Sequence, residues 1–481
     1  MSVINIRFKY ESIILCISLL VYLFSEYFPL NILILSSIFL LHVRWQLYSG
    51  YLSFLVYFIK EIMNNVFYYN TSYLLNTIIT IFCYICIVIS IICNFTFPLF
   101  KLPKLKGNYN VGTITNDWYD NKRNRRLSAQ IWYPTNENTK KSLQSFWYPN
   151  STLIASELCR LFKVPTFILN HLNHCKSNSS LNVPIINNID DKKFPIIIFC
   201  HGFYGFKGDR SFFCEQFASF GYIVLSVDHP GDCAICTFKD GTTIPFYSFL
   251  KKGDDEYLIR NEGLKPRVDD IDFIIDKILI LNNHHNNISN STMNDTNNLN
   301  DIEKILNNNI DINNIGIFGH SYGSATCAEY LKNGKNNIHI NAAIGLDPWI
   351  FPLNTNSLNG IKKPLLFLSS EHWDPGNKYK SQRIQIIENS LSKESRGFVI
   401  KDTKHHNFDD MPFIVHPYLA KKLNFIGNIS PMKCFDITFE YSYLFFKYLN
   451  SNNNNDVNTN NINFDTIFPS STFIFEESRS K

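Results

Sequence analysis

The feature that most constrains the fold is the stretch Asn314–Glu329, whose sequence is NIGIFGHSYGSATCAE. An apolar run, Ile315–Phe318, leads into Gly-His-Ser-Tyr-Gly and then into helix-forming residues. A Gly-x-Ser-x-Gly motif between a predicted strand and a predicted helix is typical of a nucleophile elbow, in which a sharp turn exposes the serine hydroxyl. The helix that follows directs its first amides at the site where an oxyanion would form. The sequence therefore predicts Ser321 as a nucleophile.

Composition narrows the classes of partner and cofactor. The chain has 481 residues and a net charge of only +4, which is too small and too scattered to indicate a nucleic-acid partner. Its twelve cysteines are dispersed and do not resemble a disulfide scaffold. Cys83-x-x-Cys86 lies in an apolar run, and Cys233-x-x-Cys236 has no second pair at zinc spacing. We expect no metal and no cofactor.

Residues 1–100 read as a transmembrane module of three or four helices. A membrane span needs roughly 20 apolar residues, and the longest run reaches that length. A secretory signal is the competing interpretation of the first run, but no small-residue cleavage site follows it. The sequence therefore predicts a multi-pass protein of an internal or plasma membrane. The four apolar runs are Ser12–Phe24, Phe28–Val43, Leu47–Ile59 and Tyr73–Phe95.

The orientation in the membrane depends on the number of spans. Basic residues occur before the first run, at Arg44, and at Lys101, Lys104 and Lys106. Four spans would place all three groups on one face, as the positive-inside rule prefers, with the rest of the chain in the cytoplasm. Three spans would place it on the other side. The sequence leaves both topologies open.

Residues 101–449 read as a doubly wound α/β domain. Apolar runs that suit buried strands alternate with helical patterns, which indicates a mostly parallel sheet. An Asn-rich insertion near 282–314 separates a long amphipathic helix, Arg267–Leu281, from the elbow strand. A second Asn-rich stretch suggests that 450–481 is a disordered tail. The predicted strands are Leu127–Tyr133, Phe194–Phe199, Tyr222–Val227, Ile338–Leu346 and Pro364–Ser370.

The partners of Ser321 should follow it in the order acid, then histidine. Two acids come directly after predicted strands: Asp347, and Asp374 in the commoner position for this fold. The candidate bases are the adjacent His405 and His406, which the sequence alone does not rank. His201, after the strand Phe194–Phe199, reads as a structural hydrogen-bonding residue.

Several blocks of the chain resemble the plasma-type platelet-activating factor acetylhydrolases. The most specific is Leu346-Asp347-Pro348-Trp349-Ile350-Phe351-Pro352-Leu353, and the elbow, Cys200-His201-Gly202-Phe203 and His405-His406-Asn407-Phe408 agree with it. The likeness spans roughly Tyr109 to Leu449. It implies an α/β-hydrolase with Ser321 as nucleophile, Asp347 as acid and His405 as base, and with oxyanion amides from Phe203 and Tyr322.

The resemblance also implies a substrate class. It suggests calcium-independent hydrolysis of short or oxidised sn-2 acyl chains on glycerophospholipids. Ser324 and His406 depart from the family pattern, which usually has a glycine and a glutamine there. Two alternatives stay open: a general lipid or carboxyl esterase, and a membrane receptor or scaffold with a relic hydrolase fold.

Overall fold

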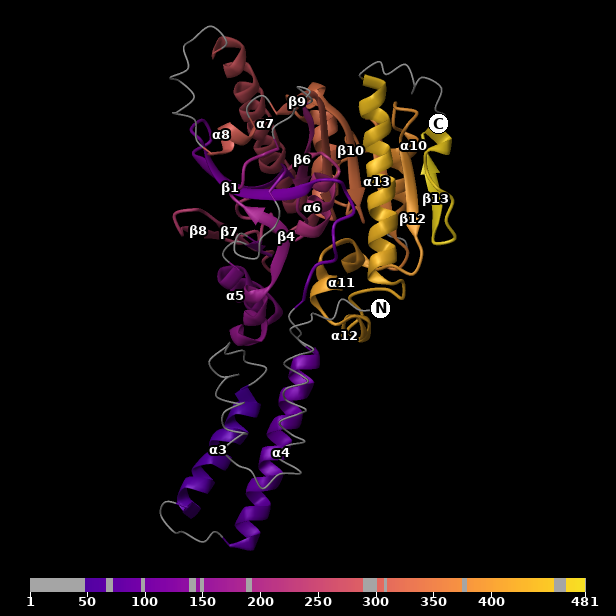
Figure 1. Cartoon of the computed structure of the whole chain (residues 1–481). Coiled ribbons are helices and arrows are strands. Elements are labelled where there is room, and N and C mark those ends of the chain that lie inside the picture. The colour runs from indigo at the N-terminus through magenta and orange to yellow at the C-terminus, as the bar shows by residue number, and fades with distance from the viewer. Residues whose placement is uncertain are drawn as a thin grey trace. The chain divides into compact units, whose positions relative to one another are not determined.

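The structure is a computed structural model of the chain (Figure 1). Its residues fall into two compact units. The first comprises residues up to Leu102 together with Ser151–Lys176 and Phe413–Lys422, and the second comprises Pro103–Asn150, Ser177–Pro412 and Leu423–Lys481. Two segments that the sequence assigns to the soluble domain thus belong to the first unit. The structure describes residues 48–65, 72–96, 100–137, 144–147, 151–186, 193–288, 301–306, 309–373, 379–453 and 464–480.

The second unit is built on a sheet of eleven described strands. Their order is β13-β12-β11-β10-β9-β5-β6-β2-β1-β4-β3, and the run from β12 to β6 is parallel. The strands are β1 Asn110–Asp120, β2 Arg125–Thr135, β3 Gln144–Phe146, β4 Lys176–Leu181, β5 Phe194–Cys200, β6 Ile223–Asp228, β9 Ile310–His320, β10 Ile340–Leu346, β11 Leu365–Ser370, β12 Arg396–Ile400 and β13 Ile474–Arg479; β7 Ile235–Thr237 and β8 Thr243–Pro245 form a separate pair. Each strand predicted from the sequence overlaps one of these.

Helices cover both faces of the parallel strands, which is why those strands are apolar throughout. On one face Phe318 of β9 packs against Phe213 of α6 at a ring-centroid distance of 5.3 Å. On the other face Ile317 of β9 shares a buried cluster with Ile271 of α7. The helices and 3-10 turns of the second unit are α6 Ser211–Ser219, α7 Glu256–Ile288, α8 Asp301–Leu306, α9 Tyr322–Asn333, η4 Asn337–His339, α10 Lys380–Glu388, η6 His405–Phe408, α13 Pro431–Asn453 and η7 Phe464–Thr466, with α11 Met411–Ile414 at its border.

The strand register brings the ends of four strands to one edge of the sheet. Cys200 of β5 pairs with Gly319, His320 of β9 with Leu346, and β11 continues to Ser370. The residues that follow these strands therefore lie at the carboxyl edge, where open α/β sheets place their functional groups.

The described parts of the Asn-rich insertion and of the predicted tail form regular secondary structure. Within the predicted insertion, α7 extends to Ile288, α8 forms at Asp301–Leu306 and β9 begins at Ile310, while 289–300 lie outside the described residues. The prediction of a disordered tail over 450–481 is wrong at both ends. Helix α13 continues to Asn453, and Ile474–Arg479 pairs antiparallel with β12 as strand β13. Ile474 is buried, so the last strand is held by packing as well as by its ladder.

The first unit contains helices α3 Tyr48–Asn65, α4 Tyr73–Thr96, α5 Ser151–Phe162 and α12 Pro417–Lys422, and the 3-10 turn η2 Thr166–His174. Within the described part of the chain, one helix is long and apolar enough to span a membrane, over Tyr73–Asn94. The runs Ser12–Phe24 and Phe28–Val43 lie outside the described residues. The described residues thus support one of the three or four predicted spans, and they do not support a multi-helix module.

Candidate active site

Ser321 occupies a strained turn between β9 and α9. Its backbone has φ 54° and ψ −120°, a conformation that non-glycine residues rarely adopt and that persists only where the surroundings impose it. The surroundings are backbone: its N–H donates to Leu346 O at 3.0 Å and its carbonyl accepts from Trp349 N at 3.1 Å. The flanking glycines are required by space, since a Cβ on Gly323 would lie 2.0 Å from Cys200 O. The turn is the elbow that the sequence predicts.

Asp347 and His405 are brought together at the same edge. Asp347 follows β10, and its Oδ2 accepts from His405 Nδ1 at 2.6 Å. Its Oδ1 accepts from the backbone N–H of Ser370 at 2.7 Å, so both carboxylate oxygens are used. The His405 ring stacks on Trp373 at a centroid distance of 4.0 Å. These contacts fix the ring plane and leave Nδ1 as the nitrogen that carries the proton.

The charges of this pair suit a base and its acid. Burial raises the pKa of Asp347, but its hydrogen bonds with His405 and Ser370 and the His405 charge outweigh burial, and the net pKa lies below the usual value. Burial lowers the pKa of His405 below its usual value, although Asp347 acts in the opposite direction. At neutral pH the carboxylate is therefore charged and the imidazole neutral, with Nε2 available to accept a proton.

His406 has a different partner. Its Nδ1 contacts Asp409 Oδ2 at 2.7 Å, within the same turn. The structure thus pairs His405 with Asp347 and His406 with Asp409. The competing acid, Asp374, lies outside the described residues.

The loop after β5 passes beside the serine. A Cβ built on Gly202 would lie 3.3 Å from the Cβ of Ser321, so a side chain at this position would be in tight contact with the serine. His201 is fully buried, and its Nε2 accepts the backbone N–H of His229 at 3.0 Å. Its Nδ1 must then carry the proton, which it donates to Gly202 O at 2.7 Å. His201 holds the loop as the sequence predicts.

Among the described residues, two groups have the spacing of metal ligands: His201, Asp228 and Cys233, and, on the surface, Glu371, His372 and Asp402. The first group already has other partners. His201 Nε2 accepts from His229, and the two Asp228 oxygens accept from the backbone N–H and the ammonium of Lys207 at 2.6 and 2.9 Å. The hydrogen-bond donors around His201 and Asp228 occupy the atoms that would otherwise bind a cation, so the first group does not fit a metal ion.

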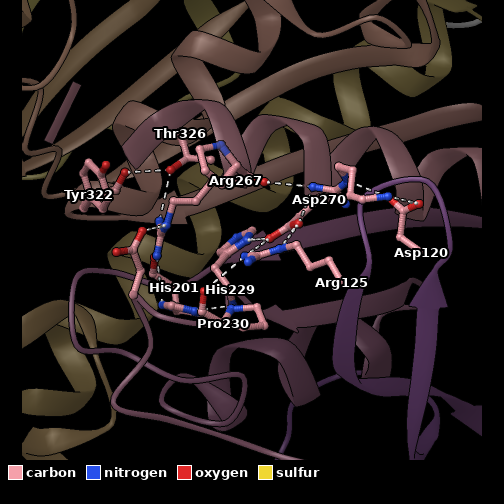
Figure 2. A network of polar contacts seen from close by, with 12 residues as sticks. Asp120, Arg125, His201, His229, Pro230, Arg267, Asp270, Tyr322 and Thr326 are labelled. Carbon is pink, nitrogen blue, oxygen red and sulfur yellow. Dashed lines mark hydrogen bonds and ion pairs between the residues drawn. The ribbon is translucent and has the colours of Figure 1, made fainter. Parts of the chain in front are cut away.

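Sequence reasoning missed a buried ionic network behind the site (Figure 2). Its centre is Asp270 of α7, which accepts from Arg125 at 2.7 and 2.9 Å and contacts His229 Nδ1 at 3.0 Å. Arg267, one turn earlier, is also completely buried. The available signal was the spacing of Arg260, Arg267 and Asp270, which places them on one side of a helix. A polar side of an amphipathic helix normally faces solvent, so the spacing was not informative by itself.

Comparison with known proteins identifies the family. Residues 95–467 match the sequence profile of the family described as platelet-activating factor acetylhydrolase, isoform II. The chain belongs to this family. A platelet-activating factor acetylhydrolase of Cavia porcellus is 27% identical over 369 residues, covering 74% of this chain and 79% of that protein. The chain is accordingly a hydrolase of carboxylic esters and a lipid esterase.

Two further relatives agree with this class. A protein of Arthroderma benhamiae named "Probable 1-alkyl-2-acetylglycerophosphocholine esterase" is 25% identical over 238 residues, which cover 47% of this chain and 51% of that protein. The structure of a ferulic acid esterase from Streptomyces cinnamoneus superposes with a TM-score of 0.55 at 19% identity, covering 73% of this chain and 92% of that one. That likeness shows the α/β-hydrolase fold.

Proposed function

We propose that Ser321, His405 and Asp347 form the catalytic triad of this esterase, with oxyanion amides from Phe203 and Tyr322. The observation that carries the proposal is the 2.6 Å contact between His405 Nδ1 and Asp347 Oδ2, at the edge where Ser321 occupies its left-handed turn. The chain order of serine, acid and histidine is the order of this fold. The orientation of His405, with Nδ1 on the acid, is the one a general base needs.

The reaction follows from these roles. Ser321 Oγ attacks the ester carbonyl carbon while His405 Nε2 takes its proton, and the carbonyl π electrons move to the oxygen, which the two amides stabilise. The tetrahedral intermediate then expels the alcohol, which takes the proton from His405 and leaves an acyl-serine. Water, deprotonated by the same nitrogen, attacks the acyl carbon. The second tetrahedral intermediate then releases the carboxylic acid as Ser321 Oγ leaves and takes the proton back from His405. Asp347 stays ionised and stabilises the imidazolium in both half-reactions.

The proposed substrates are glycerophospholipids with a short or oxidised sn-2 acyl chain, hydrolysed without calcium. The family and the relatives support this class, since the family is named for the hydrolysis of an acetyl group and the relative from Arthroderma benhamiae is named as an esterase of a 1-alkyl-2-acetylglycerophosphocholine. No step of the mechanism requires a metal ion, because His405 supplies the base and the amides supply the oxyanion donors.

We also propose that the N-terminal region anchors the enzyme in a membrane. Helix α4 is the supporting observation, because residues Tyr73–Asn94 have the length and composition of a span. Its exposed side chains include the apolar Leu74, Ile78, Ile85 and Ile92. An anchor would keep the active site close to an insoluble substrate, and the predicted multi-pass arrangement would do the same.

The decisive experiment is fluorophosphonate labelling of the full chain and of Ser321→Ala. The serine variant should lose labelling and should lose on the order of 10⁶ in kcat, since the remaining catalysis comes from binding and the oxyanion hole. Ser324→Ala is the matched control, because Ser324 is buried in the same helix turn with its Oγ donating to Gly319 O at 2.9 Å. It should still be labelled. Near-normal turnover of Ser321→Ala would refute the assignment.

Substrate class is tested separately. Short-acyl phosphatidylcholine, long-acyl phosphatidylcholine and a soluble nitrophenyl acetate should be compared at equal molar concentrations of substrate. The proposal predicts the highest kcat/KM for the short-acyl phospholipid. A preference for the nitrophenyl ester with no advantage from the phosphocholine group would favour a general esterase instead.

A further inference from the structure

One arginine contacts both halves of the proposed oxyanion hole. Arg267 comes from the middle of α7 and is 0% exposed. Its guanidinium lies between the loop after β5 and the first turn of α9 (Figure 2). We propose that Arg267 is a positioning residue that sets the direction of the two oxyanion amides. The inference rests on the proposed function, because it assumes that Phe203 and Tyr322 supply those amides.

The contacts with the loop determine where the Phe203 amide points. Arg267 donates to His201 O at 3.0 Å through one terminal nitrogen, and the other lies 3.5 Å from Gly202 O. His201 Nδ1 donates to the same Gly202 oxygen at 2.7 Å. The Gly202 carbonyl and the Phe203 N–H belong to one planar, trans peptide, so they point in opposite directions. Fixing the carbonyl toward Arg267 and His201 therefore aims the Phe203 N–H away from them.

The contacts with the elbow hold the second donor. The same nitrogen that reaches His201 O donates to Thr326 Oγ1 at 3.0 Å, and that hydroxyl donates to Tyr322 O at 3.1 Å. The guanidinium also lies 4.6 Å from the centre of the Tyr322 ring. Because Tyr322 is the first residue of α9, these contacts hold the helix start that carries its amide.

A buried arginine suits this positioning role better than it suits a role in stabilising the fold. A buried charge costs several kcal/mol of desolvation, and well-packed apolar residues of similar volume often serve stability as well or better. The one carboxylate near Arg267 among the described residues, Asp232, is 3.3 Å from its Nε. A planar guanidinium presents its donors in a rigid fork, whereas a lysine ammonium is a compact point charge on a flexible stem. One terminal nitrogen of Arg267 donates to both the loop and α9, and the second terminal nitrogen lies beside Gly202 O.

The test compares an ester with its thionoester. In a thionoester, sulfur replaces the carbonyl oxygen, and the larger, weaker acceptor gains less from amides placed to meet an oxyanion. A hole with correctly placed donors therefore favours the ester, and the ratio of the two kcat/KM values reports that placement. Global loss of active enzyme lowers both values equally and leaves the ratio unchanged.

The variants are Arg267→Met and Arg267→Lys in the full chain, assayed on nitrophenyl butyrate and its thiono analogue. We expect the ester kcat/KM to fall about 10²-fold, as for a misplacement of about 1 Å at a reacting centre, and the thionoester value to fall less than about tenfold. Arg267→Lys should resemble Arg267→Met. Arg383→Met is the matched control, because Arg383 is a buried arginine of α10 that pairs with Glu477 at 3.5 Å. It should lower the melting temperature and leave the ratio unchanged.

A milder variant tests the same proposal if the two Arg267 variants do not fold. Thr326→Val keeps the side-chain shape and removes the hydroxyl that joins Arg267 to Tyr322 O, and it should lower the ratio about three- to tenfold. Equal losses on ester and thionoester in all soluble variants would overturn the inference and leave a structural role. Its failure is distinct from failure of the proposed triad, which would appear as absent fluorophosphonate labelling of the unchanged chain.

Discussion

Replacing Asp347 by asparagine tests the acid with almost no change in shape. Asp347 is 1% exposed, and its two oxygens accept from different donors, His405 Nδ1 at 2.6 Å and Ser370 N at 2.7 Å. An asparagine has one oxygen and one NH₂ group in their place. The backbone N–H of Ser370 can only donate, whereas His405 can exchange tautomers. The substitution therefore forces a choice between two arrangements of hydrogen bonds.

In the first arrangement the amide oxygen of the new asparagine accepts from Ser370 and its NH₂ faces His405. Nδ1 must then accept, the proton moves to Nε2, and His405 no longer acts as a base toward Ser321. In the second arrangement the oxygen faces His405 and the NH₂ meets the Ser370 N–H, which leaves a buried donor unpaired at a cost of about 1–3 kcal/mol. That cost makes the active arrangement the minor one, by a factor of roughly 5 to 150 at 1.4 kcal/mol per decade.

The active minority has lost the carboxylate charge as well. Without it the imidazolium formed in the transition state is no longer stabilised, so the two losses multiply. We expect kcat to fall on the order of 10⁴-fold, as in serine hydrolases whose acid becomes asparagine. KM should change little, because Asp347 lies behind the histidine.

The assay is kcat on a short-acyl ester for Asp347→Asn and, in parallel, Asp374→Asn and Asp272→Asn. Asp272 is a matched control because it is a buried aspartate of α7 that accepts from Tyr330 at 2.7 Å. Its asparagine variant should lose stability and keep its turnover. Asp374→Asn should cost little. A loss below tenfold in Asp347→Asn, with a large loss in Asp374→Asn, would refute the choice of acid.

Three other variants test separate parts of the structure. In His406→Gln the acid limb of the kcat/KM profile should move to higher pH, because the positive charge of His406 lowers the pKa of His405 and the substitution removes that charge. Pairing with Asp409 raises the pKa of His406 against the effect of burial, which favours the charged form of its ring. An unchanged pH profile would contradict this coupling. Gly263→Ala should destabilise the fold, because the new Cβ would lie 2.8 Å from the Tyr322 hydroxyl. The gain of about 1 kcal/mol in helix propensity should be outweighed by an overpacking cost of about 1–3 kcal/mol. A raised melting temperature would contradict this expectation. A chain shortened to begin at Leu105 should keep its rate on soluble esters and lose rate on vesicle-embedded phospholipid, and equal vesicle rates would show that anchoring does not aid access.

The sequence predicts the elbow well because its requirements are local. The strain at Ser321, the glycines on either side and the following helix all lie within a few residues, so a short motif describes them. The strands around it are predicted for a similar reason, since a strand buried on both faces must be continuously apolar. The choice of His405 over His406 is not local. It depends on which ring reaches a carboxylate 58 positions away, and only the resemblance to a family ranked the two before the structure paired them.

The last strand was missed because its evidence lies outside its own sequence. Residues 474–479 read IFEESR, in which only one strongly apolar side chain, that of Ile474, is buried. Their ladder is supplied by β12, and an Asn-rich stretch precedes them. Composition predicted disorder there, and tertiary pairing overrode it.

The network around α7 explains why the burial and the pairing of its charged residues could not be predicted from the sequence. Among the ion-paired residues of the network in Figure 2, Arg123, Arg125 and Arg267 carry three positive charges, and Asp120, Asp270 and Asp232 carry three negative ones, so the paired charges balance. Burial raises the pKa of Asp270, but its bonds with His229 and Arg125 bring it down to about 2, so it stays charged at neutral pH. Burial, with the nearby Arg267 charge, holds the pKa of His201 well below its usual value and keeps that ring neutral.

A balanced set of buried charges is tolerated only as a set, since removing one partner strands the other at a cost of about 3–5 kcal/mol. Each member of the network seen alone is therefore an ordinary polar residue, typical of a solvent-facing position. The structural role of each member depends on its partners, which lie on the turn after β1, on the loops after β5 and β6, and on α9. Arg267 is the member at which this network meets the proposed oxyanion hole, so the charges that hold α7 in place also hold the loop and the helix start beside Ser321.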